Sequence, residues 1–171
     1  MPSVVIDMHL PAAADTELLG NALGRALPWP ADLGAVLYLR GELGAGKTTC
    51  VRSLLRVLGV AGLVRSPTYT LIETYVTQTF TCIHMDLYRI SGESDAEGLG
   101  LRDLAGAGTL IMVEWPEKGG ATVPRADVDL RLGYADEARS AQLRSLSATG
   151  EHWLRNLGDD TRLTPYVSNI T

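Results

Sequence analysis

One segment of this chain, Gly41-Glu42-Leu43-Gly44-Ala45-Gly46-Lys47-Thr48-Thr49, has the residue types needed to hold a polyphosphate. Its glycines let successive backbone N–H groups turn toward phosphate oxygens. Lys47 adds a mobile positive charge, and Thr48 offers a hydroxyl group to Mg²⁺. We therefore expect this segment to bind a nucleoside triphosphate together with Mg²⁺.

The residues on either side match the strand, loop and helix that such a segment requires. Ala35 to Leu39 is an apolar run and predicts a buried strand before the loop. A helix is predicted from Thr49 to Leu58, because apolar residues recur there at helical spacing and Gly59 suits the C-terminal cap. The phosphates would then meet the positive end of the helix dipole. A glycine-rich turn without a ligand is the alternative, and the flanking elements argue against it.

Two acidic residues follow predicted strands and are candidates to hold the metal. Glu114 comes directly after the apolar run Leu110 to Val113, and Asp86 follows Ile83 to Met85. A triphosphate with Mg²⁺ needs at least one carboxylate near the metal, at the end of a strand beside the loop. We expect both carboxylates near the metal; the sequence leaves open which binds it directly and which acts through water.

Further polar side chains have two interpretations each. Thr68 and Thr70 are placed like residues of a switch that closes over the γ-phosphate, or they are ordinary β-branched strand residues. The arginines that could add charge during phosphoryl transfer, or simply be solvated, are Arg65, Arg89, Arg102 and Arg139.

His84 lies inside an apolar strand and is interpreted as a core or pocket-edge histidine. No second His or Cys stands at metal-ligand spacing from it, so we expect no zinc site. Trp115, directly after Glu114, is interpreted as a packing residue, with contact to a nucleotide or partner as the alternative.

The composition favours one globular domain, residues 1–171. The chain has 171 residues, is 46% hydrophobic and carries a formal net charge of -5 without a long basic run. It therefore lacks the electrostatic footprint of an autonomous nucleic-acid binder, and any RNA contact would come through partners. Cys50 and Cys82 lie in apolar segments, which favours a reducing cytoplasm. The first residues lack a signal-peptide pattern and no apolar stretch is long enough to span a membrane, so neither secretion nor a membrane is expected.

The remaining pattern predicts an α/β fold with a mixed, mostly parallel sheet flanked by helices. Val4 to Leu10 predicts an edge strand, and Asp15 is predicted to cap a helix from Thr16 to about Leu27 that stops at Pro28 to Pro30. A hairpin is predicted next, from Leu71 to Thr77 and Phe80 to Met85. Short helical pieces are predicted within Ser91 to Gly108. Two further strands are predicted at Val128 to Leu132 and Ala141 to Leu146, with a turn from Gly133 to Arg139 between them. The tail from about residue 150 is unassigned, although Trp153, Leu154 and Leu157 predict a docked short helix.

Several segments together resemble the TsaE family, formerly called YjeE. Besides the glycine-rich segment, the matching pieces are Ser66-Pro67-Thr68-Tyr69-Thr70, His84-Met85-Asp86-Leu87-Tyr88-Arg89, Gly100-Leu101-Arg102-Asp103 and Glu114-Trp115-Pro116. The resemblance runs from about Asp15 to Leu146. It implies a P-loop ATPase fold with weak Mg²⁺-dependent ATP hydrolysis. It also implies a role with the TsaB and TsaD subunits in threonylcarbamoyl modification of adenosine 37 in tRNA, so that tRNA is reached through the complex.

The resemblance also implies roles for residues by position. Thr48 and Glu114 would bind Mg²⁺, Asp86 would lie near the metal or the attacking water, and Thr68 would belong to the switch. Lys47 and the loop from Gly41 to Thr49 would hold the phosphates, and the base would be bordered by Ala13, Ala138 and Arg139. Glu42 stands where many members have Asp, which should change little because the loop binds through its backbone.

Two other function classes use the same loop. A small-molecule kinase would also need an acceptor site and a basic lid, yet Ser91 to Gly108 holds one arginine, Arg102, among four acidic residues. A GTP-dependent switch commonly carries an Asn/Thr-Lys-x-Asp element, and Lys118 is not in such a context. Transfer of phosphate to an acceptor, or preference for GTP over ATP, would identify either class.

Overall fold

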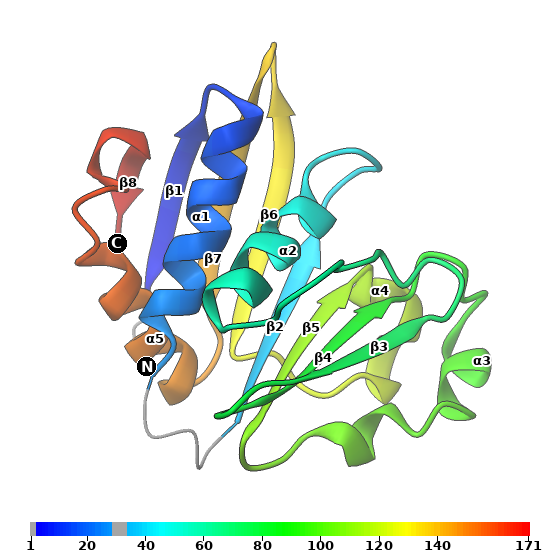
Figure 1. Ribbon diagram of the computed structural model, residues 1–171. Helices are drawn as coiled ribbons and strands as arrows, with labels where there is room; N and C mark the ends of the chain where they lie inside the picture. Colours follow the sequence, from blue (N-terminus) through cyan, green and yellow to red (C-terminus); the bar gives the residue numbers. More distant parts are fainter. Residues whose placement is uncertain (1–2, 29–33) are drawn as a thin grey trace.

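The computed structural model describes residues 3–28 and 34–171, whose strands form one mixed sheet (Figure 1). The strand order across this eight-stranded sheet is β3-β4-β5-β2-β6-β7-β1-β8. The strands are β1 (Val5–Leu10), β2 (Ala35–Arg40), β3 (Ile72–Val76), β4 (Thr81–Asp86), β5 (Thr109–Glu114), β6 (Val128–Ala135), β7 (Ala138–Ser145) and β8 (Val167–Ile170). The expected α/β class is confirmed.

The centre of the sheet is parallel and its flanks are antiparallel. β4, β5, β2 and β6 run in the same direction, and the largely apolar sequences of β4, β5 and β2 suit strands that are covered on both faces. The remaining pairings, four of seven among the described strands, are antiparallel. The prediction of a mostly parallel sheet is therefore wrong, because two hairpins, the N-terminal strand β1 and the C-terminal strand β8 add antiparallel neighbours to a parallel centre.

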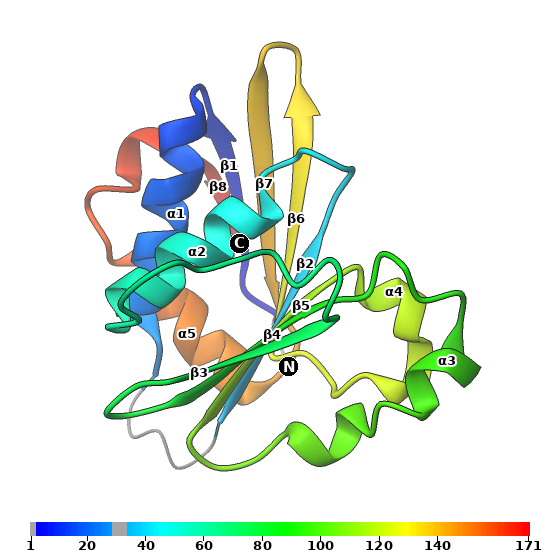
Figure 2. The same ribbon diagram turned by 45° about the vertical axis from the view of Figure 1, so that its right-hand side comes forward.

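Helices cover both faces of the sheet, as Figure 2 shows, with α1, α2 and α5 on one side and α3 and α4 on the other. The α-helices are α1 (Ala13–Ala26), α2 (Lys47–Val57), α3 (Glu93–Glu97), α4 (Pro116–Gly119) and α5 (Ala148–Gly158). Short 3-10 helices are η2 (Leu101–Leu104), η3 (Gly120–Thr122) and η4 (Thr164–Tyr166). Each face has its own cluster of buried apolar side chains. None of the helices in the described ranges has the length and apolar character to cross a membrane.

Most predicted element positions are confirmed, with corrected boundaries. The helix predicted from Thr16 begins earlier, at Ala13 in α1, and Asp15 is its third residue. The Asp15 carboxylate accepts the N–H of Ala12 at 2.7 Å, so it still serves a backbone donor at the helix start. Of the helix stop predicted at Pro28 to Pro30, Trp29 and Pro30 lie outside the described residues.

The two hairpins also form. β3 and β4 pair antiparallel as predicted. β6 and β7 pair along their whole length, so the turn predicted from Gly133 to Arg139 is too long and only Asp136 and Glu137 remain between the strands. The hairpin therefore projects beyond α1 as the long ribbon at the top of Figure 2.

The tail from about residue 150, which had no assigned role, supplies a helix and a strand. Trp153, Leu154 and Leu157 are fully buried on α5, which confirms the docked helix, and the Trp153 indole N–H donates to Leu23 O in α1 at 2.9 Å. β8 then pairs with β1, which is thus not an edge strand. The prediction for Val4 to Leu10 is correct as a strand and wrong as an edge.

Candidate functional site

The glycine-rich segment forms a tight loop between the end of β2 and the start of α2. Gly41, Gly44 and Gly46 have positive φ angles of 141°, 79° and 107°, and residues with a Cβ atom rarely adopt such angles. A Cβ atom on Gly41 would also fall under 3.0 Å from Leu132 O in β6. The sequence therefore needs glycine at Gly41, where a side chain would clash with β6, and at Gly46, which is left-handed just before α2.

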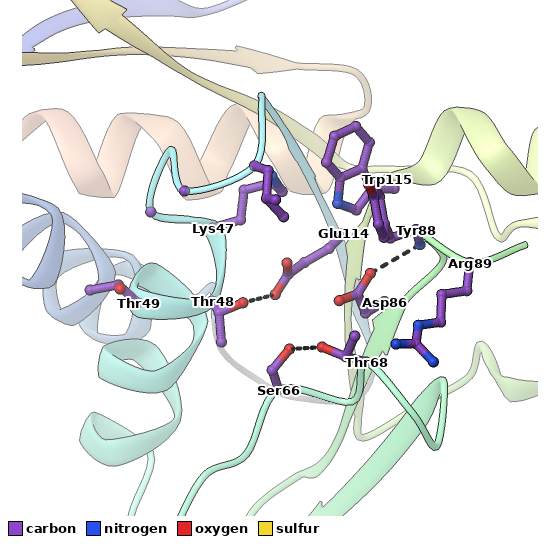
Figure 3. A pocket seen from close by; sticks show the side chains of 13 residues that line it. Lys47, Thr48, Thr49, Ser66, Thr68, Asp86, Tyr88, Arg89, Glu114 and Trp115 are labelled. Atoms are coloured by element: carbon purple, nitrogen blue, oxygen red, sulfur yellow. Dashed lines mark hydrogen bonds between the residues drawn. The ribbon is translucent and has the colours of Figure 1, made fainter.

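A cavity of about 280 Å³ opens beside this loop (Figure 3). From the loop and α2 it is lined by Leu43, Gly44, Gly46, Lys47, Thr48 and Thr49. Across from them it is lined by Ser66, Thr68, Asp86, Tyr88, Arg89, Glu114 and Trp115. The structure therefore brings together the loop, the predicted switch threonine and both predicted carboxylates, which are far apart in the sequence.

Strand register explains why the two carboxylates meet. β4 and β5 are parallel neighbours, and Asp86 pairs with Glu114 at the last position of each strand. Both side chains are almost fully buried, at 6% and 3% exposure. The Thr48 hydroxyl donates to Glu114 Oε1 at 2.8 Å, and the Asp86 carboxylate accepts the Tyr88 N–H at 3.0 Å. The Thr48 hydroxyl and the two carboxylates thus face one cavity.

This donor set fits Mg²⁺. The ion prefers oxygen ligands and is usually bound by one or two carboxylates together with phosphates and water. A buried pair of neighbouring carboxylates is costly, and Lys47 supplies one positive charge against two negative ones, which is a physical reason to expect a further cation here. In the described ranges no three His, Cys, Asp or Glu side chains are grouped as a metal site of their own. The expectation that zinc is absent stays a prediction.

The electrostatics of the cavity depend on burial. Burial raises the pKa of the Asp86 carboxyl; the Tyr88 N–H opposes this shift and the neighbouring Glu114 adds to it. Burial lowers the pKa of the Lys47 ammonium, and the carboxylates of Glu114 and Asp86 oppose that shift. Each group is therefore held in a charge state that burial penalises, and an ionic ligand would relieve part of that cost.

Lys47 is held at the mouth of the loop. Its Nζ donates to Gly41 O at 2.6 Å and to Glu42 O at 2.9 Å. The same ammonium lies 4.3 Å from the centre of the Trp115 ring, whose other neighbour is the Tyr88 ring at 5.0 Å. Trp115 therefore packs in the lining of the cavity, so both interpretations of this residue, packing and ligand contact, are compatible with its position.

Three residues predicted to border the base lie outside the cavity lining. Ala13 is the first residue of α1, and Ala138 and Arg139 begin β7. Of the three, Arg139 is linked to the loop through Tyr134, whose hydroxyl donates to Leu43 O at 3.1 Å and whose ring centre lies 4.2 Å from the Arg139 guanidinium. Their role toward a base stays a prediction.

The candidate arginines separate into different environments. Arg89 lines the cavity and stacks over the exposed ring of Tyr69 at 4.3 Å. Arg102 donates instead to Ala121 O, and neither Arg102 nor Arg65 lines this cavity.

Sequence reasoning missed three features of the site. Ser66 lines the cavity and shares a hydrogen bond of 2.7 Å with the Thr68 hydroxyl. Tyr88 lines it as well. His84, correctly interpreted as buried, contacts Glu114 directly, with its Nε2 2.8 Å from Oε1. The alternation of His84 and Asp86 along one strand was the signal that could have placed His84 on the side of the carboxylates.

Comparison with known proteins agrees with this site. Residues 10–142 match a family model described as "Threonylcarbamoyl adenosine biosynthesis protein TsaE". The protein of that name from Haemophilus influenzae is 39% identical over 68% of this chain and 74% of its own length. The one from Streptomyces coelicolor is 36% identical over 77% of this chain and 91% of its own length.

A solved structure agrees at the level of the fold. YdiB from Bacillus subtilis superimposes with a TM-score of 0.73, covers 92% of this chain and 97% of its own, and is 23% identical. The family match spans the loop, the two carboxylates and the other residues that line the cavity. This chain belongs to the TsaE family.

Proposed function

We propose that this protein binds and hydrolyses ATP with Mg²⁺, and that this step supports threonylcarbamoyl modification of adenosine 37 in tRNA. The observation that carries the proposal is the meeting of the Thr48 hydroxyl with Glu114 at 2.8 Å, beside Asp86 and directly after the phosphate-binding loop. The names of its relatives, which describe tRNA threonylcarbamoyladenosine biosynthesis, support the biological context.

The triphosphate is held by the loop backbone and Lys47. The amides of Gly44 to Thr48 lie at the start of α2, where the helix dipole favours negative charge. The Lys47 ammonium donates to Gly41 O and Glu42 O. Its side chain is flexible, so the ammonium can donate to phosphate oxygens instead when a triphosphate binds. The other loop residues, Leu43, Ala45 and Thr49, shape the backbone around them.

Thr48, Glu114 and Asp86 hold the cation and the attacking water. Bound Mg²⁺ would neutralise charge that develops on the phosphate oxygens during hydrolysis. Glu114 and Thr48 are hydrogen-bonded to each other, so the positions of their oxygen atoms are fixed before a ligand binds. Asp86 faces the same cavity and orients water or the metal, and Thr68 closes the switch from the side of Ser66.

ATP turnover acts on partner subunits, TsaB and TsaD, and remodels their complex between transfer cycles in the cytoplasm. Large apolar side chains at the cavity mouth support a partner at this face, because Leu43 is 72% exposed and Tyr69 is 83% exposed. The acidic composition supports contact with tRNA through the partners rather than through this chain.

The test is reconstituted modification of tRNA with TsaB and TsaD, compared at one and at many cycles. A Glu114→Ala variant is expected to lose repeated turnover, whereas Glu117→Ala serves as the matched control. Glu117 is a neighbouring carboxylate that pairs with Arg40 outside the cavity. Wild-type rates of repeated modification by a folded Glu114→Ala variant would refute the proposed role, and absence of heat on titrating MgATP into wild-type protein would refute ATP binding itself.

A further inference from the structure

His84 is buried beneath the two carboxylates and contacts one of them. It has no exposed surface, and its Nε2 lies 2.8 Å from Glu114 Oε1. The same oxygen accepts the Thr48 hydroxyl at 2.8 Å. Two hydrogen bonds therefore converge on one oxygen of Glu114. Figure 3 shows the bond from Thr48, with the second oxygen of the Glu114 carboxylate on the side of Lys47.

The strand pattern places His84 in this position. Successive side chains alternate between the faces of a sheet, so Cys82, His84 and Asp86 lie on the same face of β4. β5 presents Met112 opposite His84, and Glu114 opposite Asp86. His84 thus reaches Glu114 diagonally, from one layer deeper in the core.

The hydrogen bonding selects one form of the imidazole ring. A carboxylate oxygen accepts hydrogen bonds, so Nε2 must carry the proton in order to donate to Glu114. Among the described residues Nδ1 has no hydrogen-bond partner. A bare Nδ1 costs less here than a buried, unpaired N–H, and this favours the tautomer with its proton on Nε2.

We propose that His84 is a positioning residue for the metal: its Nε2–H orients the Glu114 carboxylate so that the free oxygen faces the cation, directly or through water. This inference rests on the proposed Mg²⁺-ATP function. The physical reason is that Thr48 alone could not fix the plane of the carboxylate, whereas two donors on one oxygen restrict its rotation. Groups that orient a metal-binding carboxylate in this way typically change metal affinity by about 10- to 100-fold when removed.

Two substitutions of nearly equal shape separate positioning from packing. Gln places an amide N–H as many bonds from Cβ as the imidazole Nε2, so His84→Gln keeps the donor. Met has a similar length without a donor, so His84→Met keeps the apolar filling alone. Met112→Leu is the control for packing, because Met112 is fully buried in the same layer and is the strand partner of His84.

The first measurement is nucleotide binding by calorimetry, at a series of Mg²⁺ concentrations and in EDTA. His84→Met is expected to need about tenfold more Mg²⁺ or more for half-maximal binding, with unchanged affinity in EDTA. His84→Gln and Met112→Leu are expected to stay close to wild type. An unaltered Mg²⁺ dependence in folded His84→Met overturns the proposal, and so does an equal loss in His84→Met and Met112→Leu.

The second measurement needs no variant and no nucleotide. Long-range ¹H–¹⁵N spectra of wild-type protein with labelled histidine distinguish a protonated ring nitrogen from a bare one, and the expected proton lies on Nε2 of His84. A proton on Nδ1 with a bare Nε2 overturns the proposal even if His84→Met does not fold. If wild-type protein binds no MgATP, the proposed function fails, and that result is separate from the ring assignment.

Discussion

Close packing of α1 on α2 predicts that Gly20→Ala destabilises the protein, although alanine favours helices. Gly20 lies on the face of α1 that packs against α2, and a Cβ atom there would fall under 3.0 Å from Cys50 O and 2.9 Å from Ser53 Cβ. The oxygen belongs to the backbone of α2 and cannot rotate away. The two helices must therefore separate to accept even one methyl group.

The expected magnitude follows from two opposing terms. Replacing glycine by alanine at an open helix position stabilises by about 1 kcal/mol. Adding a methyl group to a filled contact costs about 1–3 kcal/mol, and a clash with backbone lies at the upper end of that range. The net loss for Gly20→Ala is therefore about 1–2 kcal/mol, or about 2–8 °C in Tm for a domain of this size.

The packing of α1 also supports the phosphate-binding loop. Thr16, one helical turn before Gly20, packs against Gly46, where a Cβ atom would lie 3.0 Å from Thr16 Cγ2. Separation of α1 from α2 would remove this support from the loop. We therefore expect Gly20→Ala also to weaken MgATP binding, measured by calorimetry.

Two other glycines provide controls in urea and thermal denaturation followed by circular dichroism. Gly24→Ala, with its nearest atom Leu54 O at 3.1 Å, should change the free energy of unfolding by less than about 1 kcal/mol, because the two terms nearly cancel. Gly98→Ala, with its nearest atom at 3.8 Å and helical backbone, should be neutral or slightly stabilising. The reasoning is refuted if Gly20→Ala is as stable as Gly98→Ala.

Three further predictions concern the metal, the thiols and the C-terminal strand. Thr48→Val should weaken Mg²⁺-dependent ATP binding by about tenfold or more, because it removes a hydroxyl that bonds to a charged group, whereas Thr48→Ser should bind nearly as wild type in the same calorimetric assay. Burial raises the pKa of Cys50 to about 12 and that of Cys82 to about 11, whereas the unfolded thiols titrate near 9.0. The unfolded state therefore loses these protons first, and the free energy of unfolding should fall above about pH 9, by up to about 1.4 kcal/mol per pH unit and per cysteine. Urea titrations should show a shallower slope for the double Cys→Ala variant, and an equal slope would contradict this cause. Removal of residues 167–171 should expose the edge of β1 and cause concentration-dependent self-association, and sedimentation identical to the full chain would count against it.

Much of the site could be predicted because its parts are local. The loop needs glycines at fixed offsets, and a strand before it and a helix after it show periodic apolar residues. Glu114 and Asp86 were recognisable since each ends a predicted buried strand, and such ends meet at one edge of a parallel sheet. The family resemblance rested on these same local motifs.

The parts that sequence reasoning missed depend on contacts between distant segments. The Gly20 contact with Cys50 and the contact of His84 with Glu114 join different elements, and no periodicity within one element reveals them. The sequence predicted the helix that α1 forms, but not that its glycines set the distance to α2. The strand β8 was missed because it is short and largely exposed, so it lacks the apolar alternation that marks a strand.

The sequence by itself thus determined which side chains could bind phosphate and a divalent cation, and on which kind of element each of them lies. Only the tertiary structure decided which of them meet. Strand order and register bring Asp86, Glu114 and Thr48 to one cavity and leave Ala13, Ala138 and Arg139 outside its lining. The physical reason is that backbone periodicity acts over a few residues, whereas the neighbours of a strand are chosen by burial and hydrogen bonding of the whole sheet.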